Sequence, residues 1–299
     1  MKKVILILLI IISCMGCTYE GPHYGCDRGS LNLVFTYEGN TDNFDLSVAS
    51  DIELYLYNSE GNKIEMRHIP YNDIKGGQPY SFELQYTGTT YLVAWTISGD
   101  KDIDKEPLMF LNEENYSEIR FAMSKKTLRQ SQMYNGSAQD LFWKNLIFDS
   151  NPLEEKNVNV EVKKLLCNIT VTIEEGNSFK IQYPGELRVN IWGSSDSYHV
   201  SENQQSGDGI VIEDKFSYIE SRDEYVSENK VLPASIDSES GEEDNIVVTL
   251  FEDGIARLRV DTEAKAREGS QIDIVIRPTK QEAIITVDSW QIRKALVML

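Results

Sequence analysis

The feature of this sequence that most constrains its fold is a series of short runs in which apolar and polar residues alternate. One run places Leu31, Leu33 and Phe35 at every second position, and residues 51–58 alternate in the same way. Because successive side chains of a strand point to opposite faces, this period of two is typical of strands with one buried face. Further strand runs occupy residues 63–69, 80–86, 185–192, 246–251, 256–260, 271–277 and 283–287, and residues 90–98 form a more buried strand with Trp95 at its centre. Regularly spaced short strands with few helical patterns predict an all-β protein built of antiparallel β-sandwiches.

The length of the chain, 299 residues, is enough for two such sandwiches. The strongest strand pattern covers residues 158–174, and it follows the polar stretch Asn151–Asn157, which contains a proline. Polar segments with proline are typical of linkers between domains. We therefore predict an N-terminal domain over residues 30–154 and a C-terminal domain over residues 155–299.

Two other stretches lack a strand pattern. Residues 193–209 are rich in Ser, Asn and Gly, and residues 235–245 are mostly acidic or small and polar. Such composition is typical of solvated loops and turns. We predict a long polar loop for the first stretch and an acidic turn for the second.

The N-terminus predicts export. Lys2 and Lys3 precede an unbroken aliphatic run, Val4–Ile12, whose length suits the core of a signal peptide. The run is too short to span a bilayer, which takes about 18 or more apolar residues. The folded part of the chain is therefore expected to lie on one side of a membrane.

The end of this segment predicts lipid attachment. Met15-Gly16-Cys17 resembles the lipobox of bacterial lipoproteins, in which the cysteine carries acyl chains. Cys14 sits in a similar context and is the alternative lipidated residue, but polar sequence begins directly after Cys17. We predict a signal peptide over residues 1–16 and a lipidated tether over residues 17–29. Two acyl chains would hold such a protein stably on a membrane.

The charge balance limits the partners. The chain has 48 acidic against 29 basic residues, a net charge of −19. Binding to phosphate groups needs Lys and Arg, so this balance disfavours nucleic acid and anionic lipid headgroups.

The sequence contains no motif for catalysis. It lacks a P-loop, a dinucleotide-binding fingerprint and a nucleophile elbow, and its three histidines are far apart. Asp100, Asp102 and Asp104 resemble a calcium loop, but Lys105 stands where that loop needs glycine. We predict that the protein is not an enzyme and that it has no catalytic residue, metal site or cofactor.

Cysteine and tryptophan leave alternatives open. Cys26 and Cys167 could form one disulfide in an oxidising compartment, or they could be two separate thiols, because Cys167 lies within a strand pattern. Trp95 and Trp192 also lie in apolar strand patterns, which favours core packing. Exposed Tyr and Trp side chains would instead favour a surface lipoprotein that binds glycans.

Several motifs follow one another along the chain: the lipobox cysteine, Cys26-Asp27-Arg28-Gly29, the strands at residues 31–37 and 51–58, Asp140-Leu141-Phe142-Trp143, the strand pattern at residues 158–173 and Asp288-Ser289-Trp290. By the order and spacing of these motifs, nearly the whole mature chain resembles a known family, the FimB-like fimbrillin-associated anchor lipoproteins of Bacteroidia. The resemblance implies two transthyretin-like β-sandwich domains. It also implies attachment to the outer membrane, at the base of a type V fimbrium, by a protein that binds fimbrillin shaft subunits and limits fimbrial length.

Two departures from the family pattern leave the exact role open between a basal anchor and an accessory or tip subunit. Trp143-Lys144 stands where an aromatic-glycine pair is common, and residues 293–299 run past the expected final strand. The leading hypothesis is a fimbrial anchor and assembly protein that uses β-strand addition. The alternative is the glycan-binding surface lipoprotein.

The C-terminal tail is a candidate assembly strand. Trp290 and Ile292 would share one face of an extended segment, and Leu296 and Val297 belong to an apolar end that water would disfavour. The tail is expected to be either the last strand of its own domain or a donor strand that completes a neighbouring subunit.

Overall fold

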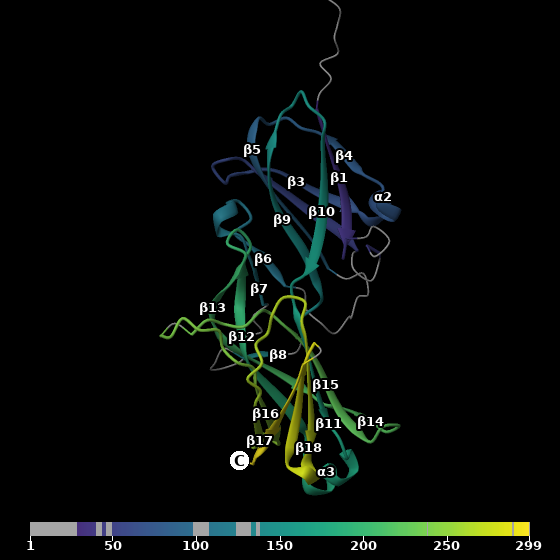
Figure 1. Ribbon diagram of the computed structural model, residues 1–299, viewed down its shortest axis with the longest axis vertical. Coiled ribbons are helices and arrows are strands. Elements are labelled where there is room, and N and C mark those ends of the chain that lie inside the picture. The colour runs from purple at the N-terminus through teal and green to yellow at the C-terminus, as the bar shows by residue number, and fades with distance from the viewer. Residues whose placement is uncertain are drawn as a thin grey trace, which may run out of the picture.

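The structure, a computed structural model, describes residues 29–39, 44–45, 50–97, 108–123, 133–135, 138–237, 239–288 and 290–298. The described chain forms two β-sheet lobes stacked along the long axis (Figure 1). Strands dominate both lobes, which confirms the predicted all-β class.

The N-terminal lobe is a two-layered sandwich. Its sheet has the order β3-β2-β5-β9-β10-β1-β4, but β9 and β10 pair only at Trp143 with Lys163 and at Phe142 with Lys164. This short link lets β4, β1 and β10 form one layer and the other four strands form the second, with one apolar cluster between them. The strands are β1 (Ser30–Tyr37), β2 (Asp51–Tyr57), β3 (Lys63–Pro70), β4 (Tyr80–Glu83), β5 (Gly88–Ile97), β9 (Leu141–Ser150) and β10 (Lys156–Lys164), and α2 (Tyr71–Ile74) and η1 (Lys75–Gly77) follow β3.

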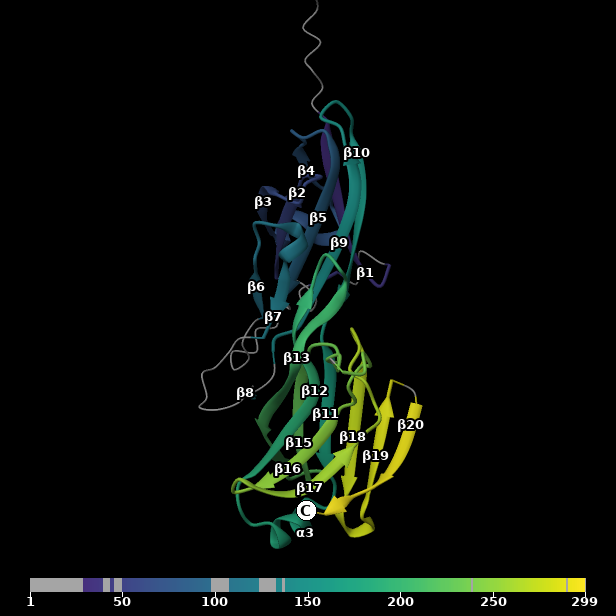
Figure 2. The ribbon, with the colours of Figure 1, turned by 90° about the vertical axis from the view of Figure 1, so that its left-hand side faces the viewer.

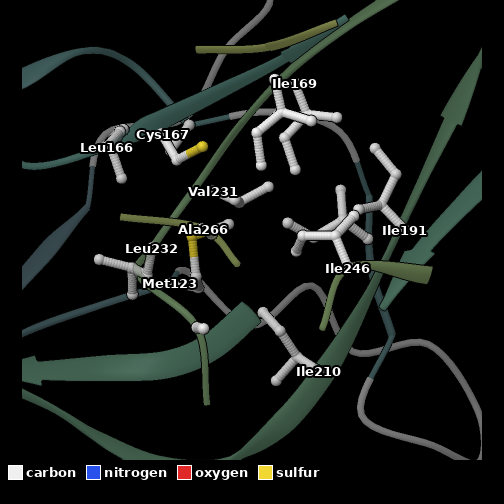
Figure 3. Close-up of a cluster of buried hydrophobic side chains, with 14 of the residues drawn as sticks. Met123, Leu166, Cys167, Ile169, Ile191, Ile210, Val231, Leu232, Ile246 and Ala266 are labelled. Atoms are coloured by element: carbon white, nitrogen blue, oxygen red, sulfur yellow. The ribbon is translucent and has the colours of Figure 1, made fainter. Parts of the chain in front are cut away.

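The C-terminal lobe packs a six-stranded sheet on an eight-stranded sheet. The first has the order β14-β15-β11-β18-β19-β20. The second has the order β21-β17-β16-β12-β13-β8, and β7 also pairs with β12 and β6 with β7. Its strands are β6 (Met109–Leu111), β7 (Arg120–Ala122), β8 (Met133–Asn135), β11 (Cys167–Ile173), β12 (Leu187–His199), β13 (Gln204–Lys215), β14 (Ser217–Ile219), β15 (Glu224–Val231), β16 (Val247–Glu252), β17 (Ile255–Asp261), β18 (Gln271–Arg277), β19 (Glu282–Val287), β20 (Trp290–Ala295) and β21 (Val297–Met298). Its helices are α3 (Gly176–Gln182) and η3 (Pro278–Lys280), whereas η2 (Tyr116–Glu118), between β6 and β7, bonds to the β2–β3 turn of the N-terminal lobe through the Tyr116 N–H and the Gly61 carbonyl. Figure 3 shows its core, which includes Met123, Leu166, Cys167, Ile169, Ile191, Ile210, Val231, Leu232, Ile246 and Ala266.

Most strand pairs of the described chain are antiparallel, as predicted, and each sandwich also contains at least one parallel pair. β1 runs parallel to β10, β11 runs parallel to β18, and β13 runs parallel to β8. Parallel partners need long connections, and these partners are far apart in sequence. Periodicity within one run therefore cannot reveal its partner.

The polar stretch at residues 151–157 is not the point where the lobes separate. It contains the turn between β9 and β10 and the start of β10, and both strands belong to the N-terminal sheet. The chain crosses between lobes at Leu165 and Leu166, both fully buried. The predicted boundary is therefore wrong by about ten residues, because a polar turn within a sheet has the same composition as a linker.

Residues 193–209 are not a loop. β12 continues to His199 across an irregularity in register between Trp192 and Ser194, and β13 begins at Gln204. The Ser194 and Ser195 hydroxyls donate hydrogen bonds to the Leu232 and Pro233 carbonyls at 3.1 and 2.9 Å. Because these bonds satisfy the buried hydroxyls, a polar sequence can form an interior strand.

Aromatic side chains join the two lobes. Trp143 on β9 is fully buried, and its ring centroid lies 5.4 Å from that of Tyr198 on β12 and 6.1 Å from that of Phe121 on β7. Lys163 on β10 pairs with Glu268 at 2.5 Å, and the Tyr198 hydroxyl donates a hydrogen bond to the same carboxylate. Figure 2 shows β12 and β13 extending from the lower lobe toward the upper one. The apolar cluster of the C-terminal lobe therefore extends onto strands of the N-terminal lobe and is shared by both, whereas the interior of the N-terminal sandwich forms a separate cluster.

Candidate anchoring and assembly site

The tether enters the fold at Gly29. The Gly29 N–H donates a hydrogen bond to the Pro152 carbonyl, and its carbonyl accepts one from the Leu84 N–H at 3.0 Å. A Cβ added to Gly29 would lie 2.1 Å from the Glu154 carbonyl oxygen, so only glycine fits this close approach without a shift. Cys17, Cys14 and the rest of the predicted tether before Gly29 lie outside the described residues. The entry point itself is a fixed part of the N-terminal sandwich.

Cys167 is a buried free thiol at the start of β11. Burial raises the pKa of the Cys167 thiol to about 11, and the Ser270 hydroxyl lies 3.1 Å from its sulfur. The other cysteine of the expected disulfide, Cys26, lies outside the described residues.

The distance along the N-terminal lobe argues against a bond between these two cysteines. Cys26 precedes Gly29 by three residues, which limits its reach from Gly29 to about 10 Å. β10 alone, from Lys156 near Gly29 to Lys164, spans about 26 Å, and Cys167 lies beyond it. A disulfide needs Cα atoms within about 7 Å of each other, so this separation favours the second alternative from the sequence, two separate thiols.

The C-terminal tail is a strand of its own lobe. β20 pairs antiparallel with β19 from Trp290 opposite Val287 to Ala295 opposite Glu282, and Ile292 lies opposite Ile285. The chain then turns, and Val297 in β21 pairs with Arg259 of the other sheet. The tail therefore touches both sheets of the sandwich. In the single chain the tail is therefore the last strand of its own domain, which is the first of the two expectations.

The tail also leaves an exposed edge. β20 is the outer strand of the six-stranded sheet, and within the described residues its other side pairs with no strand. The Trp290 side chain is 79% exposed, whereas Leu296 packs against the core and its N–H donates to the Gln281 carbonyl at 3.1 Å. Unpaired N–H and C=O groups on an edge are a template for another strand.

The four tryptophans occupy different environments. Trp95 packs on the shared core, as its apolar strand pattern predicts, and Trp143 lies inside that core. Trp192 is 38% exposed on the outer face of the eight-stranded sheet, so the expectation of core packing is wrong for this residue. Its indole lies over Gly209, where an added Cβ would lie 3.4 Å from the ring. The two cross-strand neighbours of Trp192 are Val211 and Val247. The outer face is therefore apolar here, and its residues look in the sequence like those of an inner face.

The two histidines of the described residues lie on different strands, β3 and β12. His68 on β3 contacts Glu53 at 2.7 Å and Asp51 at 3.4 Å, and the hydrogen bond to Glu53 raises the pKa of His68. His199 lies on β12, and His23 lies outside the described residues. Across the part of the chain that the structure describes, no group of three or more His, Cys, Asp and Glu side chains is placed to hold a metal ion. No helix in that part is long and apolar enough to span a membrane.

One polar depression lies on the outer face of the six-stranded sheet. It has a volume of about 280 Å³ and is lined by Asn168, Thr170, Glu228, Asn229, Lys230 and Gln271. No aromatic ring lines it, so it does not offer the stacking surface that sugars prefer.

These features define a two-lobed, all-β protein with a fixed N-terminal entry point and an exposed terminal edge strand. The family model for fimbrillin-A associated anchor proteins Mfa1 and Mfa2 matches residues 22–295. The chain therefore belongs to this family of fimbrial anchor and assembly proteins, and the resemblance found in the sequence is confirmed.

Solved structures show the same fold at low sequence identity. The fimbrial anchor protein Mfa2 from Porphyromonas gingivalis is 11% identical over 89% of this chain and 99% of its own, with a TM-score of 0.55. A candidate adhesin from Bacteroides ovatus is 12% identical over 89% and 95%, with a TM-score of 0.62. A candidate polysaccharide-binding protein from Bacteroides thetaiotaomicron is 12% identical over 89% and 98%, also with a TM-score of 0.62. A search of curated proteins found no match.

Proposed function

We propose that this protein anchors a fimbrium to the outer membrane, at the fimbrial base, through acyl chains on Cys17, with Cys14 as the alternative. Family membership supports the fimbrial role, and the lipobox-like sequence supports the lipid. The shape supports both, because Gly29 enters beside the β9–β10 turn at one end and the C-terminus lies at the other (Figure 1). One end is thus available for the membrane and the other for the shaft.

The observation that carries the assembly part of this proposal is the exposed edge at β20. A strand of a fimbrillin shaft subunit would add to this edge through main-chain hydrogen bonds, and side chains at alternate positions would set the register. Trp290 would contribute a large apolar contact at the start of the strand, because its side chain is mostly exposed in the single chain. The anchor would also limit fimbrial length if the last shaft subunit occupies its β20 edge and the anchor offers no second edge to another subunit.

Site-specific crosslinking tests this assignment in fimbriated cells. A photoreactive amino acid at Trp290 is expected to yield a covalent product with a fimbrillin subunit, identified by mass spectrometry. The control is the same substitution at Leu153, which is 69% exposed on the turn beside Gly29 at the opposite end. Equal products at both positions, or no fimbrillin product at Trp290, would contradict assembly at β20.

Glycan binding is the second candidate, favoured by one observation. Trp192 exposes part of its ring on the outer face of the eight-stranded sheet. Asn190, two residues earlier on β12, and Glu213, its partner on β13, are the neighbouring polar residues. Such a face offers stacking together with hydrogen-bonding groups. Loss of binding to a glycan array on Trp192→Ala, with binding kept on Trp290→Ala, would support this function. An array on which the unaltered protein binds nothing would reject it.

A further inference from the structure

The first strand of the fold is held on both sides. β1 pairs parallel with β10 at seven positions, from Leu31 opposite Lys156 to Tyr37 opposite Val162, and antiparallel with β4 at four positions. Leu31, Leu33 and Phe35 are almost fully buried in the sandwich. The segment that follows the tether directly is therefore among the most embedded parts of the N-terminal lobe.

Side chains add to the β1–β10 contact. The Asn32 amide donates a hydrogen bond to the Asn157 side-chain oxygen at 2.9 Å, and the Thr36 hydroxyl donates to that of Asn159 at 3.2 Å. These bonds lie on the outer face of the pair, opposite the apolar core. Both faces of the pair are therefore bonded or packed along its length.

β10 also leads directly into the other lobe. After Lys164 the chain passes through Leu165 and Leu166, both fully buried, and becomes β11. The Leu165 N–H donates to the Leu141 carbonyl at 2.9 Å, which fixes the crossing. β11 lies inside its sheet, paired with β15 on one side and with β18 on the other. The route from tether to distal lobe thus consists of paired or buried backbone.

The direction of these strands decides how tension acts on them. β1 and β10 lie roughly along the long axis, with the C-terminus at the far end (Figure 2). Tension between the two ends of the chain pulls β1 toward its own start and β10 toward its own end. In a parallel pair these two directions are opposite and lie along the strands. All hydrogen bonds of the pair are then sheared together, whereas an unzipping force breaks them one at a time.

We propose that the parallel β1–β10 pair is a load-bearing clamp that transmits tension from the N-terminal tether to the distal lobe. This mechanical function rests on the proposed attachment through the N-terminus. The clamp uses local backbone geometry, so it works without the lipid. Its test can therefore fail or succeed independently of the lipid and shaft assignments.

Single-molecule pulling in two directions tests the clamp. The mature chain with Cys17→Ala and Cys26→Ser carries one handle at its N-terminus and a second handle either at the C-terminus or at Leu153→Cys. The first geometry shears β1 against β10, and the second peels β1 away from the same end of β10. Ruptures of the N-terminal lobe are recognised by the length of chain that they release. We expect a severalfold higher rupture force in the shearing geometry at equal loading rate. Equal forces, or a higher force on peeling, would overturn the proposal.

Two matched variants distinguish a load-bearing role of the β1–β10 pair from a general contribution to the stability of the lobe. Leu33→Ala on β1 and Leu54→Ala on β2 delete the same side chain from the same buried cluster. Forced unfolding follows the unfolding rate along the pulled route. We therefore expect Leu33→Ala to lower the shearing force well below that of Leu54→Ala, although both reduce chemical stability. A larger loss of force for Leu54→Ala would show that load passes through β2 instead.

Discussion

Cys167 shows how burial decides the chemistry of one side chain. Its thiol is fully buried, and burial raises its pKa to about 11. Only the thiolate reacts, and at pH 8 about a thousandth of such a thiol is ionised. In a Cys17→Ala, Cys26→Ser chain we expect negligible maleimide labelling of the native protein and complete labelling in urea. Fast labelling of the native chain, or a Cys26–Cys167 crosslinked peptide from unreduced wild-type protein, would contradict the assignment.

His68 makes a surface contact that depends on pH. The hydrogen bond to Glu53, and then the nearby carboxylates, raise its pKa above the ordinary value of about 6.5. Because the folded pKa is raised, the stabilisation is fully present below about pH 6.5 and is lost as pH rises through the raised value. We expect NMR titration to give a raised pKa that falls in Glu53→Gln. An unchanged pKa in that variant would show that Glu53 is not the cause.

The C-terminal strands are expected to stabilise the single chain. Truncation after Asp288 removes the β19–β20 pairing and the packing of Leu296. We expect thermal unfolding to occur several degrees lower, because an edge strand and a partly buried leucine are both lost. Truncation after Ala295 keeps β20 and should cost less. Unchanged melting after the longer truncation would mean that the tail contributes nothing to its own lobe.

How far sequence alone predicts this fold depends on the element. Strands with one buried face, such as β2 and β18, follow from alternation, because their burial alternates. β9 and the second half of β12 do not, because β9 has apolar residues on both faces and β12 buries serines whose partners are distant carbonyls. The tail is a candidate strand in the sequence, and local patterns also predict β17 and β19, but no local pattern shows that the tail pairs with these two strands. The β20 edge is visible only once the sheet order is known.

At the scale of the whole molecule, the shared aromatic core predicts that the lobes unfold together. Trp143 is fully buried between them, in contact with Tyr198 and Phe121. Trp143→Ala should cost about 3–5 kcal/mol of unfolding free energy. Urea titration with one spectroscopic probe in each lobe should give a single coincident transition in the unaltered chain. Two separated transitions in that chain would mean that the lobes are independent domains.

In the proposed function this chain ties a fimbrium to a membrane through its N-terminal cysteine, and loss of that cysteine tests this claim most directly. Fimbriated cells that carry Cys17→Ala are fed a palmitate analogue, and label, protein and fimbriae are then quantified in cells and medium. We expect the label to disappear and both the protein and the fimbriae to move into the medium, while Cys14→Ala behaves like the unaltered chain. Retained label and cell-bound fimbriae in Cys17→Ala, with loss in Cys14→Ala, would move the lipid to Cys14. Retention of fimbriae in both variants and in their combination would contradict the claim.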